Sequence, residues 1–275
     1  MIYILTALYA EAKPLIRHLQ LKKKKGLGPI QVFASDTIVL TVSGPGPLSA
    51  AIGTTFMLST HPPQPNDLLI NFGICGTKSD RFSIGETVIV HKLIDAVTMG
   101  SYYPDMLVEH PFQEATLQTF PSPVDSGTPM QAELADMEGT GFYEAASKFL
   151  GPHRIVLVKV VADRLQPHTV NIEAVTRLCE NALPSLETIM DRYIATELPP
   201  APTLTEEEEA QIIRLCEQWK LSVTLRHQLL QAAKQYKIRT NQELPDLSSW
   251  LSVPIENKRE GKKYVEQLRQ YLLYE

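Results

Sequence analysis

Apolar runs typical of fully buried strands recur through the first two thirds of the chain, and helical patterns or glycine-rich turns follow them. The runs span residues 2–8, 37–44, 67–76, 85–96 and 154–163. Helices are predicted at 11–19, 44–59 and 171–194, and a further one is predicted to begin near residue 138. Buried strands that alternate with helices predict a mostly parallel sheet with helices on both faces. Ligands bind such sheets at the carboxyl ends of the strands.

The pattern changes near residue 198. Thirteen of the 14 glycines lie before residue 199, whereas both tryptophans, Trp219 and Trp250, lie after it. The junction is rich in proline and then acidic, which is typical of a linker followed by a helix start. Three helices are predicted beyond it, at 205–220, 223–237 and 258–274. We therefore expect a domain of residues 1–198 and an all-helical extension of residues 199–275, whose apolar stripes would pack on the domain.

The charge balance argues against a nucleic-acid partner. The net charge is −5, and the extension carries equal numbers of basic and acidic residues, so its helices do not form a basic recognition face. The only basic run, "KKKK" at 22–25, is interpreted as a solvated loop. The apolar fraction of 44% and the charged fraction of 21% are typical of a globular protein.

The sequence also bears on location in the cell. No apolar run reaches the length of a membrane span, and the N-terminus reads as a buried strand rather than a signal peptide. Cys75, Cys179 and Cys216 are odd in number and far apart, which favours reduced thiols over a disulfide framework. We therefore expect a cytoplasmic protein without a membrane partner.

Acidic residues stand where the predicted strands end. Glu11 follows the first strand, Asp136 and Glu138 stand at a helix start, and Asp163 ends the last strand of the domain. These acids are either separate helix caps and surface charges, or they form a cluster in one cleft. Such a cluster is costly because like charges repel one another, so it would be expected only where it has a function. Two glycines follow Glu138, and each costs a helix roughly 1 kcal/mol relative to alanine, so a close approach to the backbone is expected there.

Five segments resemble, in order, the motifs of the nucleoside phosphorylase and nucleosidase superfamily, most closely its methylthioadenosine/S-adenosylhomocysteine nucleosidase branch. The segments are "ALYAEAKPL", "VSGPGPLSAAIGTT", "PNDLLINFGICGT", "ADMEGTGFYEAASKF" and "VLVKVVAD". No single segment is highly specific, but the ordered set is, and it covers residues 1–198. The resemblance implies a three-layer α/β/α sandwich around a mixed, partly barrel-like sheet. It also implies a homodimer.

The resemblance assigns roles to the acids. Asp163 would protonate or hydrogen-bond N7 and the exocyclic amine of a purine, and Glu11 would orient and deprotonate the attacking water. Glu138 would bind the ribose hydroxyls, with Met137 packing under the sugar. Further substrate-binding positions would be Gly44, Gly76 and Ala162. The implied activity is hydrolysis of the N-glycosidic bond of a nucleoside such as 5′-methylthioadenosine or S-adenosylhomocysteine, without a cofactor or metal.

The chain departs from the family pattern at several positions. Lys159 replaces an arginine, Ile74 a serine, Ala162 a serine, and Asp136 the first glutamate of the E-M-E motif. The segment before Asp136 is short, although in the family it supplies an aromatic residue that stacks on the base. The stretch "VDSGTP" also resembles futalosine hydrolases. These departures leave open a futalosine hydrolase-like enzyme and a nucleoside-binding pseudoenzyme.

Water is favoured over phosphate as the nucleophile. Phosphorylases of the superfamily hold phosphate with arginines, but here one such position is Asn71, and no arginine follows the first strand before Arg17. A phosphate-dependent phosphorylase remains the alternative. Cys75 lacks the His–Asn pattern of a cysteine nucleophile, and the histidines show no metal-ligand spacing.

Overall fold

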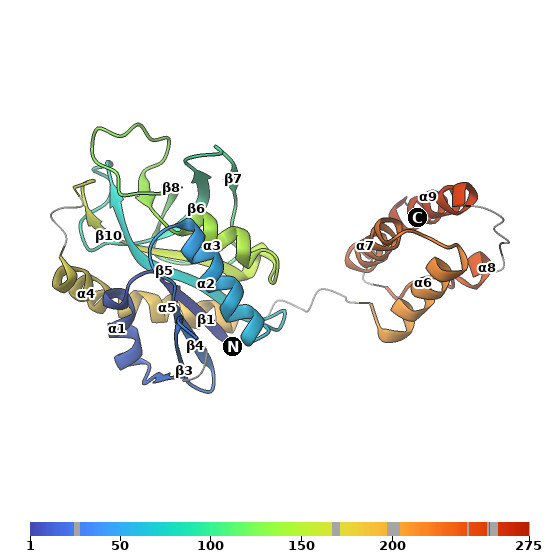
Figure 1. The fold of residues 1–275 in the computed structure, drawn as a ribbon, viewed down its shortest axis with the longest axis horizontal. Helices are drawn as coiled ribbons and strands as arrows, with labels where there is room; N and C mark the ends of the chain where they lie inside the picture. The colour runs from blue at the N-terminus through green and yellow to red at the C-terminus, as the bar shows by residue number, and fades with distance from the viewer. Residues whose placement is uncertain are drawn as a thin grey trace. The chain divides into compact units, whose positions relative to one another are not determined.

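The computed structural model describes residues 1–24, 28–166, 171–196, 204–240, 242–251, 253 and 258–274. The chain divides into two compact units, Met1–Glu197 (unit 1) and Leu198–Glu275 (unit 2) (Figure 1). No helix of the described segments is both long and apolar enough to cross a membrane.

Unit 1 is built on one large mixed sheet. Its strands are β1 (Ile2–Thr6), β2 (Lys22–Lys23), β3 (Gln31–Ala34), β4 (Ile38–Val42), β5 (Leu68–Thr77), β6 (Thr87–Asp95), β7 (Ser101–Tyr102), β8 (Gln113–Thr119), β9 (Leu134–Asp136) and β10 (Ile155–Asp163). The order across the sheet is β10-β6-β8-β9-β5-β1-β4-β3-β2, with β7 paired to β6. Because β10 also pairs with β5, the five strands β5, β10, β6, β8 and β9 close into a ring.

The sheet has helices on both faces, as Figure 1 shows. The helices of unit 1 are α1 (Tyr9–His18), α2 (Pro47–Thr60), α3 (Gly139–Ala146), α4 (Ile172–Asn181) and α5 (Leu183–Ala195), with a short 3-10 helix at Pro152–Arg154. Strand β1 is buried along its whole length because alternate side chains meet different helices. Tyr3 and Leu5 belong to the core that includes α2 and α3, whereas Ile2 and Ile4 belong to the core that includes α1, α4 and α5.

The predicted α/β/α fold with a partly barrel-like sheet is confirmed, and three local expectations are corrected. Half of the ten pairings between described strands are antiparallel, so the sheet is mixed rather than mostly parallel. The helix predicted at 171–194 is two helices, because Pro184 stands in the first turn of α5 and begins a new helix there. Lys22 and Lys23 form the edge strand β2 rather than a loop, whereas Lys25 lies outside the described residues.

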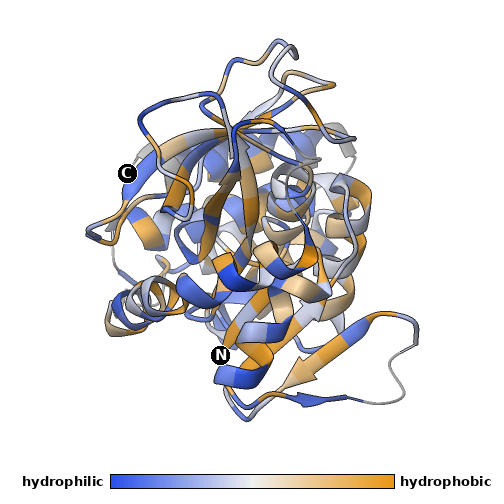
Figure 2. Ribbon diagram, turned by 90° about the vertical axis from the view of Figure 1, so that its left-hand side faces the viewer, coloured by the Kyte–Doolittle hydropathy of each residue, from blue (hydrophilic) through white to orange (hydrophobic). Residues whose placement is uncertain are grey.

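Unit 2 is all-helical, with α6 (Glu206–Gln218), α7 (Val223–Thr240), α8 (Ser248–Leu251) and α9 (Lys258–Tyr274). Its core is its own: Ile212, Leu229 and Leu268 are fully buried around Trp219, whose ring lies 6.3 Å from that of Trp250. All of these core residues come from unit 2. In Figure 2, in which unit 1 faces the viewer, the helices of unit 1 likewise mix hydrophilic and hydrophobic residues, as helices with one buried face do. Unit 2 therefore buries its own apolar stripes, which removes the reason for expecting that it needs the domain to cover them.

A largely buried ion pair stabilises the start of α6 in unit 2. Thr205 and Glu208 form a capping box at the beginning of α6. The Glu208 carboxylate also accepts hydrogen bonds from Lys237 Nζ at 2.5 Å and from the backbone N–H of Leu244 at 2.9 Å. Despite partial burial, these bonds lower the pKa of Glu208 to about 2.

Candidate active site

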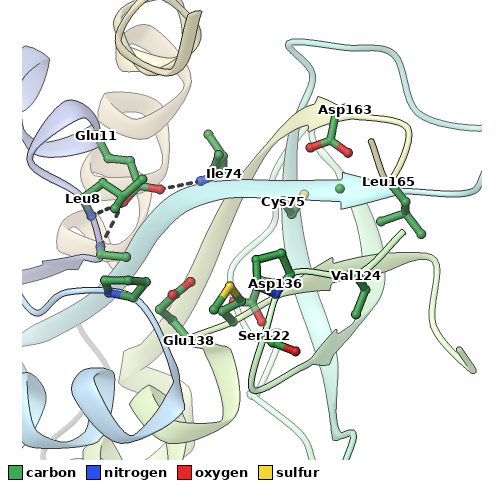
Figure 3. A pocket seen from close by; sticks show the side chains of 16 residues that line it. Leu8, Glu11, Ile74, Cys75, Ser122, Val124, Asp136, Glu138, Asp163 and Leu165 are labelled. Carbon is green, nitrogen blue, oxygen red and sulfur yellow. Dashed lines mark hydrogen bonds between the residues drawn. The ribbon is translucent and has the colours of Figure 1, made fainter. Parts of the chain in front are cut away.

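A pocket in unit 1 lies where β1, β5, β9 and β10 end (Figure 3). Its lining residues are Ala7, Leu8, Glu11, Pro45, Ile74, Cys75, Gly76, Ser122, Pro123, Val124, Ala135, Asp136, Met137, Glu138, Asp163 and Leu165. The set is aliphatic and acidic: it contains four carboxylates and no aromatic, lysine or arginine side chain among the described residues. The strand ends therefore bring together acids that are far apart in the sequence.

Glu11 is held in place by backbone amides. Its Oε2 accepts hydrogen bonds from Ala7 N and Leu8 N, both at 2.9 Å, and its Oε1 accepts one from Ile74 N at 3.0 Å. The approach requires a glycine on β5, because a Cβ at Gly73 would lie 2.8 Å from Oε1. The side chain is only 2% exposed, and burial raises its pKa although the three amides and Lys159 lower it. Glu11 is thus a fixed acid of raised proton affinity, as a general base for water requires.

Asp163 ends β10 beside a β-bulge. The register with β5 shifts between Val161 and Asp163, so Ala162 is the extra residue. Bulges change the direction of side chains near active sites. Here the Asp163 side chain, directly after the bulge, lines the pocket. Its Oδ1 accepts a hydrogen bond from Gln166 N at 2.8 Å. In Figure 3 Asp163 lies at the opposite end of the pocket from Leu8 and Glu11.

Glu138 occupies the N-cap position of α3 without capping it. Its Oε1 instead accepts a hydrogen bond from Gly46 N at 2.9 Å, in the turn that precedes α2. Burial and the charge of Asp136 raise the pKa of Glu138 to about 7, although Lys159 and Gly46 oppose the shift. The helix start therefore supplies a carboxylate that faces the pocket and changes charge near neutral pH.

Asp136 is more than a residue at a helix start, because it forms a buried ion pair with Lys159. The distance from Lys159 Nζ to Asp136 Oδ2 is 2.8 Å, and the two side chains are 1% and 0% exposed. Asp136 also accepts hydrogen bonds from Thr119 Oγ1 at 2.7 Å and from Gly139 N at 2.8 Å. Burial lowers the pKa of Lys159, but Asp136, with Glu138 and Glu11, raises it overall, so the lysine is charged.

The two glycines after Glu138 serve close packing. A Cβ at Gly139 would lie 2.8 Å from Leu93 Cδ2 and 2.9 Å from Leu117 Cδ2, on strands β6 and β8. A Cβ at Gly141 would lie 1.9 Å from the backbone oxygen of Pro47, at the start of α2. The expected close approach to the backbone is therefore present, toward the sheet at one glycine and toward a helix at the other.

Five of the seven predicted site residues line the pocket. They are Glu11, Gly76, Met137, Glu138 and Asp163. Gly44 and Ala162 do not line it: Gly44 has a φ of 85° and donates its N–H to Ala7 O, and Ala162 is the bulged residue of β10. Burial raises the pKa of the Cys75 thiol, which keeps it protonated and argues against a cysteine nucleophile. Within the described segments no group of three His, Cys, Asp or Glu side chains is arranged to hold a metal ion.

Comparisons with known proteins bear on the fold and on the sequence resemblance. No family model matches the chain. A 5′-methylthioadenosine/S-adenosylhomocysteine nucleosidase of Marinomonas sp. (strain MWYL1) is 26% identical over 155 residues, which cover 54% of this chain and 63% of that protein. The match thus spans less than two thirds of that relative's length.

Solved nucleosidases share the architecture. The 5′-methylthioadenosine/S-adenosylhomocysteine nucleosidase of Helicobacter pylori aligns with a TM-score of 0.59 at 13% identity, over 69% of this chain and 97% of its own. The futalosine hydrolase of Helicobacter pylori strain 26695 gives the same four values. The 5′-methylthioadenosine nucleosidase of Arabidopsis thaliana aligns with a TM-score of 0.59 at 18% identity, over 72% of this chain and 96% of its own.

Unit 1 has the nucleosidase fold. The resemblance to the nucleoside phosphorylase and nucleosidase superfamily is therefore confirmed in sequence and in architecture. In this nucleosidase fold, sequence reasoning identified Lys159 only as a departure from the motifs and Asp136 as a departure and as a cap or cluster acid, and it did not pair the two. It missed Leu165 and Val124, for which neither charge nor glycine gave a signal.

Proposed function

We propose that unit 1 is a nucleosidase that hydrolyses the N-glycosidic bond of a purine nucleoside such as 5′-methylthioadenosine or S-adenosylhomocysteine. The observation that carries the proposal is the convergence of Glu11, Glu138 and Asp163 on one pocket. The three acids come from three different strand or helix ends. Glu11 and Asp163 lie at opposite ends of the pocket in Figure 3, as groups that act on the water and on the base of one nucleoside would.

The chemistry assigns each acid a step. The C1′–N9 bond breaks, its electron pair passes to the base, and Asp163 delivers a proton to N7. Positive charge that develops on the sugar is stabilised by Glu138, which also binds the ribose hydroxyls. Water attacks C1′ and gives its proton to Glu11, whose carboxylate is preorganised by three backbone amides. Glu11 then releases a proton to solvent and Asp163 takes one up.

The charges around the pocket support water as the nucleophile. A phosphate dianion would need cationic donors, but no lysine or arginine is among the described lining residues. The nearby Lys159 is paired with Asp136. The role that Ile74 plays here does not depend on its side chain, because its backbone N–H holds Glu11. This weakens the pseudoenzyme alternative that the loss of a serine at this position suggested.

A second substrate has a specific observation in its favour. The described lining lacks an aromatic residue for base stacking, and the futalosine hydrolase of Helicobacter pylori shares the fold as closely as the methylthioadenosine nucleosidases do. A futalosine-type nucleoside, whose base is a purine, would use the same three acids. The test therefore includes it beside 5′-methylthioadenosine and S-adenosylhomocysteine.

The experiment follows release of the free base by chromatography, with and without phosphate. The full chain is expected to release base without phosphate, whereas Glu11→Gln and Asp163→Asn each lower turnover by at least about a hundredfold, the scale of a lost acid or base. Glu173→Gln on the exposed start of α4 serves as the matched control. Strict dependence on phosphate would replace hydrolysis by phosphorolysis, and wild-type rates in both variants would reject the site.

A further inference from the structure

A leucine in a strained backbone conformation follows Asp163. Leu165 has a φ of 56°, in the left-handed region that residues other than glycine rarely adopt. The tight turn is closed by the hydrogen bond from Gln166 N to Asp163 Oδ1. Although it follows the end of a strand, Leu165 is only 2% exposed. Strain of this kind persists where the surroundings fix it, and it concentrates at ligand sites.

The left-handed turn directs the Leu165 side chain onto β5 and into the pocket. A Cβ at Gly76 would lie 2.6 Å from Leu165 Cδ2, so the glycine makes room for the leucine. Leu165 packs in one apolar cluster with Phe120 and Ala135, against which Val124 is also packed. In Figure 3 the side chains of Leu165 and Val124 lie at the same end of the pocket, near Asp163 and away from Glu11.

This end of the pocket is chemically simple. Next to the Asp163 carboxylate stand the branched aliphatic groups of Leu165 and Val124, with no aromatic ring in the described lining. A planar, polar-edged base fits such a site with its edge on the carboxylate and with the aliphatic groups around it. Among the residues that line the pocket, Leu165 is the closest in sequence to Asp163, so its size sets how much space remains beside the edge of the base.

We propose that Leu165 is a specificity-determining residue that limits the size of the base beside Asp163. The inference rests on the proposed nucleosidase function, because it assigns the base to the Asp163 end of the pocket. It assigns a purine with a small exocyclic group, such as adenine, and excludes purines that are enlarged at that group.

Binding of free bases tests the inference without requiring turnover. Calorimetric titration of the full chain with adenine and with N6-benzyladenine gives the ratio of the two dissociation constants. Adenine is expected to bind the wild type at least about a hundredfold more tightly, and Leu165→Ala is expected to reduce this ratio at least about tenfold, the scale of pocket-size discrimination. Leu150→Ala, at a leucine that is 6% exposed and outside the pocket lining, is the control and should leave the ratio unchanged.

A second variant separates size from stability. Asparagine tolerates the left-handed conformation and has the same number of side-chain heavy atoms as leucine, with the same branching. Leu165→Asn is therefore expected to weaken the binding of both bases by about the same factor and to preserve the ratio. A ratio that changes less than about twofold in Leu165→Ala, or a wild type that binds neither base, overturns the inference. If the ratio shifts as expected while no nucleoside is cleaved, the proposed function fails and the role of Leu165 in base selection stands.

Discussion

Glu138 couples the chemistry of the pocket to the stability of unit 1. Its pKa is raised to about 7 by burial and by Asp136, whereas an exposed glutamate titrates near 4.5. Between these values the folded chain binds more protons than the unfolded chain. The contribution of Glu138 to the free energy of unfolding is therefore fully present below about pH 4.5 and is lost as the pH rises through about 7.

Glu138→Gln is consequently expected to lower activity and to stabilise the protein at alkaline pH. The gain in unfolding free energy should be near zero at the acid end and reach roughly 3 kcal/mol above neutrality, the scale of a pKa raised from 4.5 to about 7. Thermal unfolding across this range measures it, with Glu180→Gln on the exposed face of α4 as control. A difference that does not vary with pH would contradict the argument.

At the residue scale the acids could be predicted and their partners could not. Glu11 and Asp163 stand at the ends of apolar runs and Glu138 at a predicted helix start, and the ends of neighbouring strands meet at one edge of a sheet. The pairing of Lys159 with Asp136 depends on which strands lie beside β5, and an apolar pattern does not contain that information. The strained turn at Leu165 also escaped prediction because no glycine marks it.

At the scale of elements, Lys159 ties β10 to the corner between β9 and α3. Lys159→Met leaves the Asp136 carboxylate buried without its cation, which is expected to cost about 3–5 kcal/mol of stability. The double variant Lys159→Met with Asp136→Asn removes both charges and should recover most of that loss of stability. Lys159→Arg keeps the positive charge and serves as the conservative comparison. Urea unfolding of the variants as a double-mutant cycle measures the coupling. A loss of equal size in the single and double variants would show that the pair does not hold the corner.

The predicted elements succeeded where the pattern was strongly apolar. Strands β1, β5 and β10 are buried on both faces, and apolar runs marked all three. Strand β8 was missed because its sequence, "QEATLQT", is largely polar, and β7 and β9 were missed because they are only two and three residues long. Polar residues are tolerated in β8 because they find partners: Gln118 accepts a hydrogen bond from Gln131 N at 2.8 Å.

At the scale of the whole molecule, the two units have separate hydrophobic cores. Residues 1–197 alone are therefore expected to remain folded, and to bind and cleave nucleoside within about threefold of the full chain. Residues 198–275 alone are expected to give a helical circular-dichroism spectrum and a cooperative thermal transition. Light scattering of the full chain and of residues 1–197 also tests the predicted homodimer.

Two results would contradict the separate roles of the two units. If residues 1–197 are soluble but bind no nucleoside, unit 2 contributes to the site and the proposed division of labour fails. If residues 198–275 bind DNA with a steep dependence on salt, the argument from balanced charge against a nucleic-acid partner fails.

The ring closed by β5 and β10 has a consequence for the nascent chain. Strands β1, β4 and β5 leave the ribosome well before β10, so the edge of β5 that later pairs with β10 has no partner during much of synthesis. Unpaired edges favour association with other chains, and pairing between distant segments forms slowly. Because Lys159 and Asp163 both arrive with β10, the pocket is completed late in synthesis, when only α4 and α5 of unit 1 are still to follow. A ribosome that stalls before residue 155 therefore displays an open sheet edge and an incomplete pocket.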